Sequence, residues 1–277
     1  MFKDILVPLL LGENHEAALA SACAIAARHE AHLVALVGVS MVTPIATAWA
    51  YYPAGIYETI DEVAQATARA LADEVQQRLS RESVSHEVRR SDSLWMTSAE
   101  QAALNARYAD LVVLGVGRPI RDAEKRMFAS LLLDSGRPVL VVPAGAPMAA
   151  SSGHAVLAWK SSGEAARAVH DAMPLLLGAR SVDVLVIERE PDEDEREKIS
   201  GSDIATHLSR HGLAVNVVLR PHTPPSTGQS ILAYAQACGA DLIVAGGYGR
   251  SRALEQLFGG VTRTLLEHAT MPVLFSH

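Results

Sequence analysis

The sequence predicts an α/β fold made of two tandem copies of one small domain, each a five-stranded parallel sheet flanked by helices. Three observations lead to this prediction. The 277 residues suit two domains of ordinary size. Short apolar runs alternate with longer segments of helical periodicity, which is typical of parallel strands joined by right-handed helical crossovers. Finally, segments of the first half recur in the second half.

The internal repeat defines the domain organisation. Three segments recur in the same order: Ala109–Val113 as Ala240–Val244, Pro138–Val141 as Pro272–Phe275, and Ile5–Pro8 as Ala155–Ala158. The stretch from Pro143 to Gly153 is rich in Pro, Ala, Gly and Ser, a composition typical of linkers. We therefore expect one domain at residues 1–143 and the other at 154–277.

The first half contains five short apolar runs and four segments of helical periodicity. We expect strands at Ile5–Pro8, Leu33–Val39, His86–Arg90, Leu111–Gly115 and Val139–Val142. We expect helices at Glu13–Glu30, Glu58–Arg81, Leu94–Arg107 and Ala123–Ser135.

The second half repeats this alternation. Its expected strands are Ala155–Trp159, Val182–Ile187, Val215–Leu219, Leu242–Gly246 and Val273–Phe275. Its expected helices are Glu164–Leu177, Glu193–His211, Gly228–Cys238 and Arg252–His268. The last strand of each half is short and apolar at a sheet edge, and open edges invite pairing. We therefore expect Val139–Val142 and Val273–Phe275 to face each other within one chain or between two chains.

Two segments break the repeat. Residues 40–57 form an insertion with the aromatic side chains of Trp49, Tyr51, Tyr52 and Tyr57, which could form a ligand lid or partner surface or pack against the protein itself. Because grouped aromatics are costly to leave in water, we expect Trp49 to be buried. The acidic run at residues 188–198 is interpreted as a solvated helix start.

Composition narrows the function classes. A net charge of −7 argues against nucleic-acid binding, which needs a basic face, but allows a single nucleotide. No apolar run approaches the length of a membrane span, and the opening segment is interpreted as a strand rather than a signal peptide. Cys23 and Cys238 are expected to be buried free thiols, which suggests a reducing, cytoplasmic compartment.

A glycine-rich segment, Gly246–Ser251, follows a predicted strand and opens a predicted helix. Glycines let backbone N–H groups approach an anion, and a helix N-terminus adds partial positive charge, so this order suits a phosphate-binding loop. The glycines could instead serve close packing alone.

The glycine spacing is similar to the ATP-binding signature of the universal stress protein family. The motif is Gly246-x2-Gly249-x9-Gly259, followed by Val261-Thr262 and Pro272-Val273-Leu274. The segments Ala158–Ser162 and Glu164–Arg167 resemble the first strand and helix of the family. Since the resemblance covers both halves, the chain resembles a tandem member. The resemblance implies Rossmann-like, adenine nucleotide alpha hydrolase-like domains with strand order 3-2-1-4-5, paired through their last strands.

The resemblance also implies a nucleotide site in the second half, for ATP with ADP or AMP as alternatives and Mg²⁺ as a companion ion. Its residues would be Ala158, Trp159, Lys160, Ile187, Gly246, Tyr248, Gly249, Arg250, Gly259, Gly260, Val261 and Thr262. The glycines would surround the phosphates, whereas the two strand ends would face the adenosine.

The sequence departs from the family pattern in both halves. Gly260 stands where ATP binders usually have Ser or Thr, and Lys160 stands where they have Asp. In the first half Leu10 replaces that Asp, and the segment Gly115–Pro119 is one residue short. We therefore interpret the first domain as degenerate for ATP.

Other chemistries find no support in the sequence. No Walker lysine follows the glycines, and the eleven histidines show no HExxH or comparable ligand spacing. We predict no catalytic residues and no metal site. The leading hypothesis is a stress-response signalling or binding protein that binds ATP or hydrolyses it very slowly. The alternative is a nucleotide-free structural or interaction protein. Expected partners are the chain itself and an unidentified protein, with neither nucleic acid nor membrane.

Overall fold

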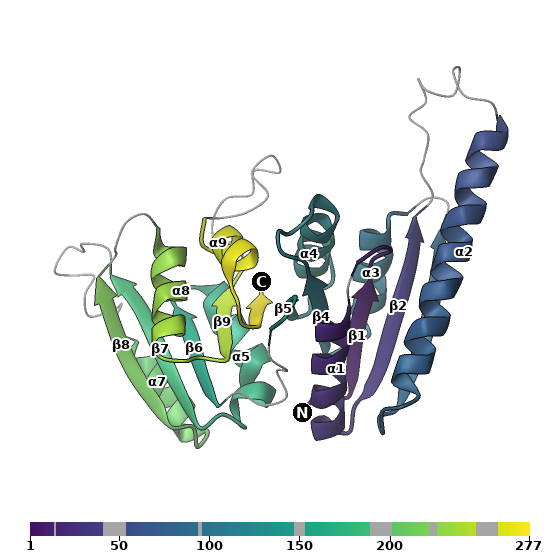
Figure 1. The fold of residues 1–277 in the computed structure, drawn as a ribbon. Helices are drawn as coiled ribbons and strands as arrows, with labels where there is room; N and C mark the ends of the chain where they lie inside the picture. Colours follow the sequence, from purple (N-terminus) through teal and green to yellow (C-terminus); the bar gives the residue numbers. More distant parts are fainter. Residues whose placement is uncertain are drawn as a thin grey trace.

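The structure is a computed structural model of the chain. It describes residues 1–13, 15–40, 54–93, 96–146, 153–188, 201–221, 226–247 and 260–277. The strands among them form one ten-stranded sheet with helices on both faces (Figure 1). The expected α/β class is therefore confirmed.

The first half follows the predicted order of elements. Its strands are β1 (Asp4–Leu9), β2 (His32–Ser40), β3 (His86–Ser93), β4 (Leu111–Val116) and β5 (Val139–Pro143). Its helices are α1 (Glu16–His29), α2 (Ala54–Leu79), α3 (Ser98–Ala106) and α4 (Asp122–Asp134). The insertion predicted at residues 40–57 meets the described structure only at its ends. Trp49, Tyr51 and Tyr52 lie outside the described residues, so the expected burial of Trp49 stays a prediction.

The second half repeats the arrangement. Its strands are β6 (His154–Trp159), β7 (Ser181–Glu188), β8 (Val215–Pro221), β9 (Leu242–Gly246) and β10 (Val273–Ser276). Its helices are α5 (Gly163–Leu176), α7 (Ser202–Arg210), α8 (Thr227–Ala237) and α9 (Gly260–His268).

One predicted helix of the second half is wrong as a single element. The sequence pattern predicts a helix over Glu193–His211, but α7 begins at Ser202. Its N-cap, Gly201, has φ 67°, a left-handed conformation that cannot continue a right-handed helix. The part of the prediction before Gly201 lies outside the described residues.

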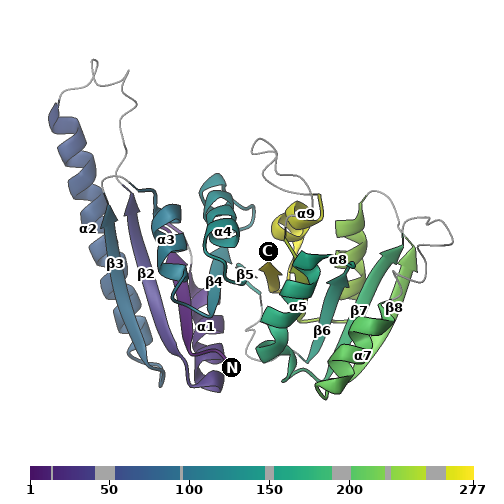
Figure 2. The ribbon, with the colours of Figure 1, turned by 180° about the vertical axis from the view of Figure 1, so that it is seen from behind.

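The order of strands is β3-β2-β1-β4-β5-β10-β9-β6-β7-β8. Each half therefore has the order 3-2-1-4-5, and its neighbouring strands are parallel. The halves join where β5 and β10 pair antiparallel, with Leu140 opposite Leu274. The expected pairing of the two last strands is thus confirmed within one chain. In both views the carboxyl ends of the strands of the two halves face the same side of the molecule (Figures 1 and 2).

Two hydrophobic layers cover the sheet, and each runs through both halves. One layer holds buried residues of α1, α2, α5 and α7, and the other holds those of α3, α4, α8 and α9. Alternating strand residues divide between the layers, so that Ile5 faces the first and Leu6 the second. None of the helices that the structure describes combines the length and hydrophobicity needed to cross a bilayer.

The repeated Ala-Asp sequence has the same structural role in both halves. The Asp110 carboxylate accepts backbone N–H groups of Lys3 and Asp4 at 2.6 and 3.1 Å. In the second half the Asp241 carboxylate accepts the N–H of Gly153 at 2.6 Å. Each aspartate therefore holds the start of the central strand of its half.

Candidate functional site

Several described members of the predicted nucleotide site lie on β6 and β9, where the second half reverses its direction of strand addition. From β6 the chain adds β7 and β8 on one side, and then β9 and β10 on the other. Ala158 of β6 lies opposite Ala245 of β9, so the carboxyl ends of these strands are neighbours. Open α/β sheets bind ligands at such a switch point.

The apolar residues proposed for nucleotide binding, from β6, β7 and α9, divide between the two faces of the sheet. Ala158, Ile187 and Val261 are half-buried against the layer that contains α8 and α9. Trp159 packs against the opposite layer, because successive strand residues point to opposite faces. The structure therefore brings three apolar members of the predicted set to one face and places Trp159 on the other.

Two opposite charges lie beside the end of β6. Lys160 is exposed, and Glu164 belongs to the first turn of α5. The pKa of Glu164 is lowered by a hydrogen bond from its own backbone N–H and one from Ser162, with smaller contributions from His277 and Lys160. The sequence pattern did not single out Glu164 as a member of the site. Its ionised carboxylate partly offsets the positive charge that Lys160 brings.

The first glycines of the loop have packing roles. A Cβ added to Gly246 would lie 2.8 Å from the backbone of Glu164 and Ala165, so β9 and the first turn of α5 touch because no side chain separates them. A Cβ at Gly247 would lie 2.6 Å from Leu132 of α4. The Gly247 N–H donates to the carbonyl of Ser276 at 2.8 Å. Close packing therefore explains both glycines without a ligand.

Gly260 follows the last glycine of the motif. Gly260 is exposed at the start of α9, and no described atom lies within 4 Å of the place a Cβ would take. Thr262, two residues later, is only 4% exposed, so its side chain lies inside the protein. Tyr248, Gly249, Arg250 and Gly259 lie outside the described residues. Among the glycines of this segment that the structure describes, Gly260 therefore differs from Gly246 and Gly247 in having no close packing contact.

The equivalent loop of the first half is filled by a side chain of the protein. Glu124 of α4 is 1% exposed. Its two carboxylate oxygens accept the backbone N–H groups of Gly117 and Arg121, each at 2.6 Å. The Arg121 guanidinium in turn pairs with Glu13 at 2.6 Å. The backbone N–H groups of this half that could bind an anion therefore already donate to a carboxylate.

The loop after β4 also contacts the second half. The Arg118 guanidinium donates to the carbonyls of Leu266 and Ala269, at the end of α9, at 3.1 and 2.6 Å. Lys125 pairs with Glu267 at 2.8 Å. The first-half loop therefore contributes contacts between the halves.

Comparisons with known proteins agree with the fold. Residues 148–277 match the model of the universal stress protein family. The crystal structure of a universal stress protein from Archaeoglobus fulgidus is similar over 98% of this chain and 95% of its own, with TM-score 0.73 and 15% identity. A putative universal stress protein from Pseudomonas aeruginosa is similar over 99% of this chain and 93% of its own, with TM-score 0.61 and 17% identity. A search of the curated proteins finds no match to the chain.

Proposed function

Because the second half of the chain, residues 148–277, belongs to the universal stress protein family, we propose that this stress-response protein binds one adenine nucleotide at the carboxyl edge of that half. The ligand is ATP or ADP, with Mg²⁺ only as the companion of ATP. The proposal treats residues 1–143 and 154–277 as two domains. The observation that carries it is the exposed Gly260, the first described residue of α9, in the half whose strand order reverses between β6 and β9.

The described residues supply two kinds of contact. Ala158, Ile187 and Val261 offer an apolar wall on one face, which suits an adenine ring. The α9 N-terminus and exposed Lys160 offer positive charge, which suits phosphates. Gly249 and Arg250, which lie outside the described residues, are the residues that the family motif would place at the phosphates.

The loop of the first half gives a reason to expect only one nucleotide per chain. A phosphate in its loop would have to displace the Glu124 carboxylate from two short hydrogen bonds. Two like charges cannot share such a buried position without a large cost.

A nucleotide-free interaction protein is the second candidate. Close packing accounts for Gly246 and Gly247, and the Gly247 N–H is already used by Ser276. In either case we propose a binding protein rather than an enzyme. We also propose the cytoplasm as its compartment, because Cys23 and Cys238 are both free thiols.

Calorimetry with ATP and ADP tests the proposal. We expect one nucleotide per chain, and no binding to Gly249→Val because a β-branched side chain would block the backbone approach. Gly260→Ser should strengthen binding about tenfold, since a hydrogen bond to a charged group contributes about 1.5–3 kcal/mol.

Gly260→Ala is the matched control, because it adds the Cβ without the hydroxyl and should leave the affinity unchanged. Two nucleotides per chain would contradict the assignment to the second half. No binding to the wild type or to Gly260→Ser would favour the interaction protein.

A further inference from the structure

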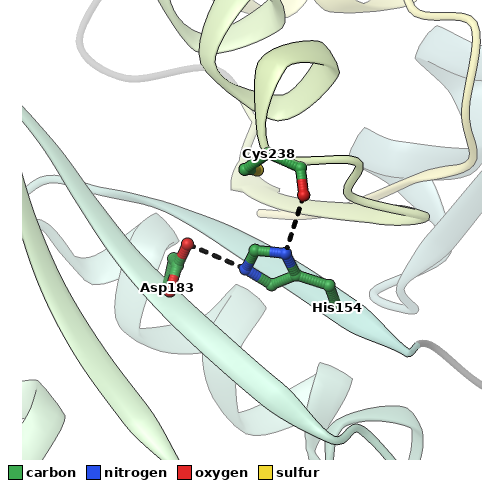
Figure 3. A group of neighbouring side chains, drawn as sticks. All are labelled: His154, Asp183 and Cys238. Atoms are coloured by element: carbon green, nitrogen blue, oxygen red, sulfur yellow. Dashed lines mark hydrogen bonds and ion pairs between the residues drawn. The ribbon is translucent and has the colours of Figure 1, made fainter.

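Three side chains with metal-binding atoms meet at the opposite edge of the second half from the nucleotide site. His154 is the first residue of β6, Asp183 lies near the start of β7, and Cys238 caps the end of α8. One nitrogen, one carboxylate oxygen and the sulfur lie within 4.8 Å of one another. Figure 3 shows the His154 ring between the Asp183 carboxylate and the backbone carbonyl of Cys238.

The contacts of His154 orient its ring as in a metal ligand. Nδ1 lies 3.2 Å from the carbonyl oxygen of Cys238 and therefore carries a proton that it donates. Nε2 lies 2.8 Å from Oδ2 of Asp183. A histidine that donates Nδ1–H to a backbone carbonyl presents Nε2 as its ligand atom, so the outer hydrogen bond of a metal site is already in place.

Asp183 is held by outer partners as well. Tyr234 donates its hydroxyl to Oδ2 at 2.7 Å, and Asn216 donates to Oδ1 at 3.0 Å. Burial alone would raise the pKa of Asp183, but hydrogen bonds from Tyr234, Asn216 and His154 outweigh it and lower the pKa. The carboxylate is therefore ionised and fixed in position.

We propose that His154, Asp183 and Cys238 bind one Zn²⁺ ion, with water as the fourth ligand. Zinc accepts nitrogen, oxygen and sulfur ligands in tetrahedral sites, and a mixed set of this kind matches its borderline softness. The three atoms lie within 4.8 Å of one another, so a small rearrangement, in which Nε2 and Oδ2 separate from 2.8 Å, places them around one ion. Zn²⁺ takes the place of the Nε2 proton that His154 donates to Asp183 and of the Cys238 thiol proton, and both protons pass to solvent. Burial raises the pKa of the Cys238 thiol, so binding should strengthen as pH rises.

Such an ion would also link distant segments of the second half. It would tie the amino ends of β6 and β7 to the end of α8, three elements that the chain connects only through long segments. The site lies away from the carboxyl edge, so it does not depend on the proposed nucleotide function. Side-chain exposure of 21% at His154 leaves the ion a route from solvent.

A histidine pair elsewhere in the second half could also bind metal and must be distinguished from this site experimentally. His207 and His211 are exposed, one helical turn apart, with ring centroids 4.8 Å apart. This i, i+4 spacing corrects the expectation that the histidines show no ligand spacing. Because such a pair binds divalent metals by itself, His207→Ala serves as a background variant.

The test uses the untagged full chain after treatment with a chelator. Co²⁺, as a spectroscopic substitute for Zn²⁺, should give a thiolate-to-metal charge-transfer band and bind one ion per chain in the His207→Ala background. Cys238→Ser should abolish the band and weaken Zn²⁺ binding by at least about tenfold. Cys23→Ser, which changes the buried cysteine of α1, should leave both unchanged.

A second measurement uses a variant in which His154, Asp183 and Cys238 are all unchanged. In Cys23→Ser, where Cys238 is the sole cysteine, Zn²⁺ should slow alkylation of the thiol and raise the thermal midpoint. A charge-transfer band that survives in Cys238→Ser, metal binding that disappears with His207→Ala, or alkylation that Zn²⁺ does not slow would each overturn the proposal.

Discussion

At the scale of single residues, Glu124 explains why the two halves differ. Its buried carboxylate accepts two backbone N–H groups from the loop after β4, the position where a glycine loop holds an anion. Pro119 removes a further N–H from the same loop. In the first half, the backbone N–H groups of this loop therefore bind a carboxylate of the protein itself.

Removing this carboxylate should destabilise the protein. Glu124→Ala leaves the N–H groups of Gly117 and Arg121 without their acceptor in a buried place, so we expect a loss of about 2–4 kcal/mol in the free energy of unfolding. Glu124→Gln keeps one acceptor and should lose less. Urea unfolding measures both.

Asp122→Ala, at an exposed position in the first turn of the same helix, is the control and should change stability little. Equal stability of Glu124→Ala and Asp122→Ala would contradict this role of Glu124.

At the scale of elements, the approach of β9 to α5 depends on Gly246. The sequence motif assigns this glycine to phosphate binding, whereas the structure gives it a packing role against Glu164 and Ala165. Both roles need a residue without a side chain, so sequence spacing cannot separate them.

Gly246→Ala should therefore destabilise the protein in the absence of any ligand. The added methyl group meets backbone atoms that cannot move without shifting α5, and overpacking of this kind costs about 1–3 kcal/mol. Thermal unfolding without nucleotide measures the effect. Gly260→Ala should be tolerated, because its methyl group has space. A Gly246→Ala protein as stable as the wild type would refute the packing role.

The order of elements was predictable because it depends on local patterns. Apolar runs and helical periodicity located the strands and helices, usually to within a few residues of their ends. The sequence pattern did not predict the helix break at Gly201, because a single left-handed residue interrupts a helix without altering the polarity of its neighbours.

The site chemistry was harder to predict, because it depends on contacts between distant segments. His154 and Asp183 are 29 positions apart on two strands, and Cys238 lies at the end of α8, so no sequence spacing indicates that the three side chains meet. Glu124 likewise reads as an ordinary acidic residue in a first helical turn until its burial is known.

At the scale of the whole molecule, the two halves share one sheet and two continuous cores. Phe128 of α4 and Phe275 of β10 meet edge to face across the seam, with ring centroids 5.1 Å apart. Arg118 and Lys125 add polar contacts to α9. The halves should therefore unfold as one cooperative unit.

Phe275→Ala tests this coupling. Both rings are fully buried, so the cavity should lower the free energy of unfolding by about 3–5 kcal/mol and separate the unfolding of the two halves. Calorimetry should then give a van't Hoff enthalpy below the calorimetric enthalpy. Phe2→Ala removes a buried ring that contacts His29 within the first half, and it should leave unfolding cooperative. Equal enthalpies in Phe275→Ala would rule out the seam as the source of cooperativity.

The antiparallel join of β5 and β10 has a consequence for mass action. Because the two strands belong to one polypeptide, each meets its partner at a local concentration that dilution does not change. A pair of separate subunits joined by the same strands would dissociate when scarce and could exchange with related subunits. This chain keeps its paired arrangement at any abundance, and neither half can be replaced by a competing copy.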